Sequence, residues 1–261
     1  MPTSAPNTPD APDARDVHAC LLPPPARGWP RLQARLVDRI KRAALRRLHA
    51  SQAGEVLLLR MYLIGEASTE QALQDEWTSQ DSPAWLSRQA ARHLEEERGH
   101  VRMFADAIAQ RGGSTHTGEP DWLSRRKIAR WKRLALRHAP HFSQGVLVPA
   151  YAIGLCAEQM GVRVLRRHCD TIGADHPLHP LLAGVLDDES RHVRLCMHTL
   201  TRIVATPELP RLEALLREIR GIERGFGISG SIGMYLAGWL CAWRSRPAAD
   251  AMRTPERDPH R

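Results

Sequence analysis

Two short sequences with a shared pattern, EEERGH and DDESRH, constrain this chain more than any other feature. The first contains Glu97 and His100, and the second contains Glu189 and His192. Residues three apart on an α-helix lie on the same face, so each glutamate and its histidine can point at one object. One such pair is common on a solvated helix face. Two related pairs in one chain indicate a shared site.

The composition around these pairs predicts an all-α protein. Long stretches are rich in Ala, Leu, Arg and Glu, and the 261 residues include only three Phe and three Tyr. We expect one long helix at about 30–65, broken near Ser51, and others at about 83–111, 144–170 and 180–205. Two shorter helices follow at about 211–223 and 228–244. The four long helices predict an antiparallel four-helix bundle with additional C-terminal helices.

The ends of the chain differ from this core in composition. Residues 1–28 are rich in Pro, Ala, Asp and Ser, and 246–261 read the same way, so we expect both to be disordered or extended. The bundle is expected at 29–206 and the C-terminal helices at 207–245.

The bundle interpretation predicts further ligands, because a two-metal bundle takes a Glu-x-x-His from each of two helices and one Glu from each of the others. Glu55 is the only acidic residue of 39–65, and Glu158 is the only one of 122–169. A lone carboxylate on an apolar face is costly unless it is paired or bound to metal. The alternative is an ion pair of Glu55 with Arg60, or of Glu158 with Arg163 or Arg166. The predicted metal ligands are Glu55, Glu97, His100, Glu158, Glu189 and His192.

The ligand types favour two iron ions, with manganese or a mixed iron and manganese site as alternatives. Zinc would more often recruit the cysteines. Beyond the metal ligands, we predict no catalytic residue. Asp188 and Glu96 each precede a ligand glutamate, and either could hold the histidine of the opposite helix, although ordinary surface charge is the alternative.

Three further residues lie near the predicted ligands. His93, one turn before Glu97, is interpreted as a hydrogen-bonded core histidine rather than a ligand. Gly154 and Gly161 lie one turn before and after Glu158, which indicates either close helix packing or an apolar channel to the metals.

HASQAGEV, EEERGH and DDESRH together resemble the ferritin-like di-iron proteins, and most closely the demethoxyubiquinone hydroxylase family of ubiquinone biosynthesis. The resemblance covers about residues 38–200, and DESRH also resembles the motif of bacterial multicomponent di-iron monooxygenases. It implies a ferritin-like fold, the six ligands above with Asp188 as their partner, and a di-iron oxidoreductase. Such an enzyme would use dioxygen and an external electron donor to hydroxylate an apolar, quinone-like small molecule.

Other functions remain open at this point. One is a ferritin-like metal protein for iron handling or peroxide removal, another is a di-iron tRNA hydroxylase, and a third is an inert bundle with a structural metal clamp. The net charge of +8 favours anionic partners, but no named RNA-binding module is present, so nucleic acid is not the favoured partner. A homo-oligomer is also left open.

The sequence also predicts where in the cell the protein is located. Five cysteines without a C-x-x-C and an N-terminus without an apolar stretch predict a cytoplasmic protein with reduced thiols. Residues 225–243 carry no charge, and 122–141 carry seven Lys or Arg with two Trp. These two segments predict either a peripheral contact with the inner face of a membrane or, for 225–243, an apolar helix packed on the bundle.

Overall fold

The computed structural model describes residues 14–25, 27–76, 83–116 and 122–244. Within these ranges the chain forms eight α-helices and two short 3-10 helices, and these ranges contain no strand. The all-α prediction is therefore confirmed. Residues 1–13 and 246–261, which we expected to be disordered or extended, lie outside the described residues.

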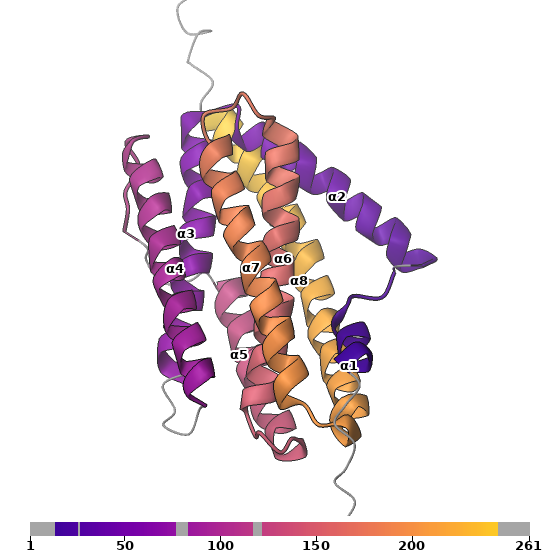
Figure 1. The fold of residues 1–261 in the computed structure, drawn as a ribbon. Coiled ribbons are helices and arrows are strands. Elements are labelled where there is room, and N and C mark those ends of the chain that lie inside the picture. The colour runs from indigo at the N-terminus through magenta and orange to yellow at the C-terminus, as the bar shows by residue number, and fades with distance from the viewer. Residues whose placement is uncertain (1–13, 26, 77–82, 117–121, 245–261) are drawn as a thin grey trace, which may run out of the picture.

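The core of the molecule is a helical bundle of α3 (Gln52–Glu76), α4 (Ala84–Ala109), α6 (Leu147–Ile172) and α7 (His179–Ile203). Helix α3 packs along α4 and α6 along α7, and α4 faces α7, as Figure 1 shows. Fully buried apolar side chains from all four helices, including Leu59, Phe104, Leu165 and Leu182, fill the space between them. Gly173 ends α6 with a φ of +78°, a backbone angle that residues other than glycine rarely adopt.

The predicted break near Ser51 separates α2 (Trp29–Leu48) from α3. Gly54 allows the tight connection, because a Cβ atom there would lie 2.1 Å from the carbonyl oxygen of Leu48. After this turn the two helices diverge. Helix α2 leans away from the bundle and packs along α8 (Leu209–Arg244), which also contacts α6 (Figure 1).

Two expectations about the ends of the described chain were wrong. Residues 14–21 form a helix, α1 (Ala14–Leu21), because Val17 and Leu21, one turn apart, are fully buried in the core that α7 and α8 help to form. Residues 209–244 form one helix instead of two. Its glycines do not break it, and Gly238 allows close packing, since a Cβ atom there would lie 3.4 Å from the Ala44 carbonyl oxygen of α2.

The basic segment forms α5 (Trp122–His138), which a single 3-10 turn follows at Ala139–His141. The C-terminal half of α8 is apolar and exposed. Its exposed stripe consists of Ile228, Ile232, Leu236, Trp239, Leu240 and Trp243. The segment Thr206–Trp243 is long and apolar enough to cross a membrane by length and composition, and only 11% of its most apolar window is buried. This face is therefore not covered by the bundle.

Candidate metal centre

A buried cluster of carboxylates and imidazoles lies inside the bundle, and all four core helices contribute to it. Its members are Glu66 from α3, His93, Glu97 and His100 from α4, Glu158 from α6, and Glu189 and His192 from α7. Six of these residues are at most 5% exposed, and the Glu66 side chain is 12% exposed. Such groups are seldom buried unless they are paired or bind a metal.

The cluster divides into two half-sites. The first half-site is His93, Glu97, Glu158 and His192, and the second is Glu66, Glu97, His100 and Glu189. Within each half-site, one ligand atom from each residue lies within 4.8 Å of the others. Each half-site could hold a metal ion, and Glu97 belongs to both.

Glu97 and Glu189 lie between the two half-sites. One oxygen of Glu97, Oε1, is 3.1 Å from His192 Nδ1, and the other, Oε2, is 3.7 Å from His100 Nδ1. Oε1 of Glu189 is 3.8 Å from the Nδ1 atom of each histidine. Both carboxylates can therefore bridge two positions.

Three atoms at the centre of the cluster have no hydrogen-bond partner. They are Nδ1 of His100, Nδ1 of His192 and Oε2 of Glu97, and all three are buried. An unpaired buried polar atom costs about 1–3 kcal/mol. Because all three are metal-ligating atoms and face one another, the residues present fit bound metal ions.

The opposite nitrogens of the two histidines have partners from across the bundle. Nε2 of His100 is 3.1 Å from Asp188 Oδ2, and Nε2 of His192 is 2.9 Å from Glu96 Oε2. The sequence analysis considered these cross-helix hydrogen bonds beside ordinary surface charge, and the structure contains them. When Nε2–H donates to a carboxylate, Nδ1 keeps its lone pair and faces the cluster. Burial alone would raise the pKa of Glu96, but His192, Arg92 and Arg191 together outweigh it through hydrogen bonds and charge, so the pKa is lowered.

The pKa shifts show that the charges of the cluster interact strongly. Burial and the neighbouring carboxylates raise the pKa of Glu66 and of Glu158 well above the ordinary value. Burial lowers the pKa of His100, yet the carboxylates around it raise that pKa to about 11 overall. Without metal, protons must therefore offset the four buried carboxylates. Two divalent ions would offset the same charge.

Five of the six sequence-predicted ligands meet in this cluster, and Glu55 does not. Glu55 lies near the start of α3, where it pairs with Arg111 at 2.8 Å and not with Arg60. Glu66 occupies the position in the cluster that the sequence analysis predicted for Glu55. Eleven residues make about three helical turns, so both glutamates lie on the same side of α3, roughly 16 Å apart along its axis.

The spacing of the ligands could have identified Glu66. Glu97 follows Glu66 by 31 residues, and Glu189 follows Glu158 by the same 31 residues. The two helix pairs α3–α4 and α6–α7 thus repeat one ligand arrangement. Glu55 does not fit this repeat.

His93 is the second residue that the sequence interpretation left out of the site. It is a hydrogen-bonded buried histidine, as expected, but its partners are ligand candidates. Its Nε2 atom is 3.1 Å from Glu97 Oε1 and 3.5 Å from Glu158 Oε1. Its ring centroid is 3.8 Å from that of His192. Neither of the arginine partners considered for Glu158 contacts it, and Arg163 pairs with Glu223 instead.

The two glycines beside Glu158 differ in their surroundings. A Cβ atom at Gly161 would lie 2.7 Å from Glu189 Oε2, so this glycine makes room for a ligand carboxylate. A Cβ atom at Gly154 would make only an ordinary 3.7 Å contact with Cys196 Sγ. Gly161 therefore serves close packing.

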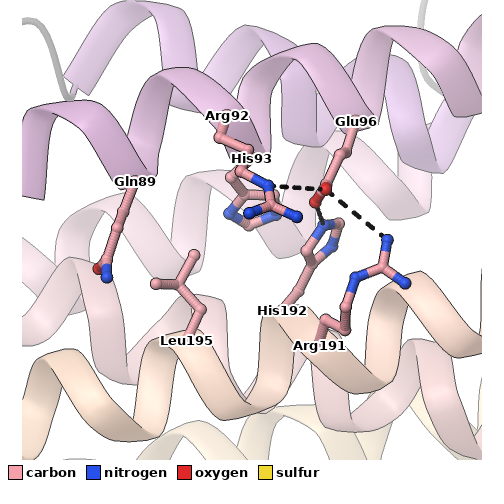
Figure 2. A pocket seen from close by; sticks show the side chains of 7 residues that line it. All are labelled: Gln89, Arg92, His93, Glu96, Arg191, His192 and Leu195. Atoms are coloured by element: carbon pink, nitrogen blue, oxygen red, sulfur yellow. Dashed lines mark hydrogen bonds and ion pairs between the residues drawn. The ribbon is translucent and has the colours of Figure 1, made fainter.

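An opening to the cluster lies between α4 and α7. This pocket has a volume of about 190 Å³. Its lining includes His93 from α4 and His192 from α7, as Figure 2 shows. Its remaining lining residues are Gln89, Arg92, Glu96, Arg191 and Leu195. The pocket reaches the first half-site from the surface.

Comparisons with protein-family models, curated proteins and solved structures found no match to this chain.

Proposed function

We propose that this protein is a ferritin-like di-iron carboxylate oxidoreductase that reacts with dioxygen. The observation that supports it best is the pair of half-sites joined by Glu97, with orphaned ligand atoms pointing between them. Four carboxylates and three imidazoles match the hard-to-borderline donor set of iron, and manganese is the alternative. The symmetric helix pairs correspond to the ferritin-like arrangement of a di-iron bundle.

The residues of the chain have separate tasks in this proposal. Glu97 and Glu189 would contribute to both metal positions, and Glu158 from α6 and Glu66 from α3 would each hold one ion. Asp188 orients His100, and Glu96 orients His192, by accepting their Nε2–H hydrogen bonds. Two bound ferrous ions would supply the electrons for dioxygen reduction. An external donor must then restore those electrons, because the sequence has no flavin or nicotinamide motif.

The pocket between α4 and α7 supplies the route for dioxygen, since it ends on His93 and His192. The family resemblance supports an apolar, quinone-like molecule as the substrate and hydroxylation as the reaction. The pocket favours a second candidate, removal of hydrogen peroxide. Its volume of about 190 Å³ and its rim of Arg92, Glu96 and Arg191 suit a small polar molecule.

Metal analysis followed by oxygen consumption tests the central claim. Protein loaded anaerobically with ferrous iron should hold two buried ions per chain and consume dioxygen after rapid mixing, with a transient absorbance change. A chain that takes up zinc alone and is inert to dioxygen would contradict the proposal. Hydrogen peroxide consumption with a reductant, measured on the same sample, separates the two candidates.

The location that we propose is the surface of an anionic membrane. The exposed stripe of α8 supplies apolar contact, and α2 exposes Arg31, Arg35 and Arg39 beside Trp29, Leu32 and Leu36. Binding to liposomes should therefore require anionic lipid and weaken as salt increases. Equal retention by neutral liposomes would refute the electrostatic part of this proposal.

A further inference from the structure

A second group of metal-ligating side chains lies at the end of the bundle where α3 begins, separate from the buried cluster. His49 lies in the turn between α2 and α3, Glu55 lies in the first turn of α3, and His176 lies in the loop between α6 and α7. Oε1 of Glu55 is 3.0 Å from His49 Nδ1 and 3.3 Å from His176 Nε2. One ligand atom from each residue thus lies within 4.8 Å of the other two.

Arg111 holds the carboxylate of Glu55 in this orientation. Its Nε–H donates to Glu55 Oε2 at 2.8 Å, and its guanidinium also donates to the carbonyl oxygen of Ala107. The other carboxylate oxygen is therefore the one that faces the two imidazoles. A carboxylate fixed by a hydrogen bond on one oxygen is a pre-oriented ligand on the other.

The second nitrogen of His49 also has a fixed partner. Its Nε2 is 2.6 Å from Nε2 of the fully buried His168, whose Nδ1 is 2.9 Å from the Tyr62 hydroxyl. If His49 Nε2–H donates along this chain, His168 Nε2 accepts it and His168 Nδ1–H donates to the Tyr62 oxygen, so both ring nitrogens of His168 are paired. His49 Nδ1 is then a lone pair 3.0 Å from a carboxylate oxygen, and two facing acceptors need a cation between them.

Without a cation, the same chain can run in the opposite direction. Tyr62 then donates to His168, His168 donates to His49, and His49 Nδ1–H donates to Glu55. Both directions keep the two imidazoles neutral. The hydrogen-bond chain therefore accommodates a bound ion at His49 Nδ1 while both ring nitrogens of His168 stay paired.

We propose that His49, Glu55 and His176 form a second, mononuclear site for a divalent transition-metal ion. Two imidazoles and one carboxylate suit an ion of the zinc class, and three protein ligands leave a position for water. The side chains of His49, Glu55 and His176 are 10%, 17% and 23% exposed. An ion can therefore reach this outer site from solvent and leave it more readily than it leaves the buried cluster.

Metal titration of the full-length chain tests the outer site, with cobalt(II) as a spectroscopic probe and zinc as a competitor. In the wild-type chain, one ion should bind rapidly, give an absorption band and leave rapidly on addition of chelator. His176→Ala and Glu55→Gln should each lower the affinity for that ion at least tenfold. Both positions are near the surface, and the glutamine keeps the shape of the glutamate. His116→Ala, which changes an exposed histidine outside the proposed site, should bind cobalt with the affinity of the wild type.

Several outcomes would overturn the outer site. One is equal cobalt affinity in His176→Ala, Glu55→Gln and the wild type, because the ion would then belong to other surface groups. The absence of a rapidly exchanging ion in the wild type is another. The test is independent of the proposed function, since Glu66→Gln should keep the rapidly exchanging ion. A chain that binds cobalt at the outer site but no ferrous iron at the buried cluster would refute the di-iron proposal and leave this one standing.

Discussion

Replacing Glu66 by glutamine tests the structure against the sequence analysis, because the sequence analysis chose Glu55 as the α3 ligand and the structure places Glu66 in the metal centre. Its carboxylate is one of four ligands in the second half-site, with Oε2 3.5 Å from His100 Nδ1. Glutamine keeps the shape of the side chain and removes its charge. We expect Glu66→Gln to lose the ion of the second half-site and to keep the ion of the first.

The expected effect on stability depends on whether metal is present. A metal ion whose free concentration is 100 times its Kd stabilises the folded state by about 2.7 kcal/mol. A chain of this size changes its Tm by roughly 2–4 °C per kcal/mol, so loss of one ion should lower the Tm by about 5–10 °C. In the metal-free protein the change should be close to zero. Burial and the neighbouring carboxylates raise the pKa of Glu66 well above its ordinary value, which favours the neutral form of this side chain when no metal is bound.

Elemental analysis and differential scanning calorimetry, each with and without chelator, provide the measurements. Glu95→Gln is the matched control, since the Glu95 side chain is 63% exposed on α4. A Glu66→Gln variant with the full wild-type content of buried metal would refute the assignment of Glu66. A large loss of stability in the metal-free variant would instead show that its charge is needed by the fold.

Three further predictions follow from the same contacts. Asp188→Asn should weaken metal binding about 10–100-fold, whereas Asp187→Asn, an exposed neighbour, should leave it unchanged in the same titration. Gly161→Ala should lower the metal content measured by elemental analysis, because the new methyl group would lie 2.7 Å from the ligand oxygen of Glu189; unchanged content would contradict the packing role. Lys41 has a pKa lowered to about 8, mainly by burial. The unfolded chain therefore binds more protons between pH 8 and about 10.4, so the stability of the wild type relative to Lys41→Met, from urea unfolding, should rise across that window.

The sequence was sufficient to predict the long helices of the bundle and most of the buried cluster. Helical periodicity places Glu97 with His100, and Glu189 with His192, on single faces. An isolated acid in an apolar stretch also identified Glu158, because the cost of burying a lone carboxylate can be inferred without coordinates. The cross-helix roles of Asp188 and Glu96 followed from their positions beside the ligands.

The missed elements share a different cause. Helix α1 forms because Val17 and Leu21 find a surface on α7 and α8, and composition alone cannot describe that surface. Helix α8 continues through its glycines because it packs on α2 and α6, so tertiary contact outweighs a weak local propensity.

Helical periodicity alone does not choose between Glu55 and Glu66, although the 31-residue spacing of the ligands favours Glu66. Periodicity shows which side of α3 faces the bundle, and both glutamates lie on that side. It does not show how far along the axis α3 meets α4 and α7. That alignment is set by the Gly54 turn and by the side chains packed between the helices, so only the folded chain places Glu66 beside His100 and leaves Glu55 with His49 and Arg111.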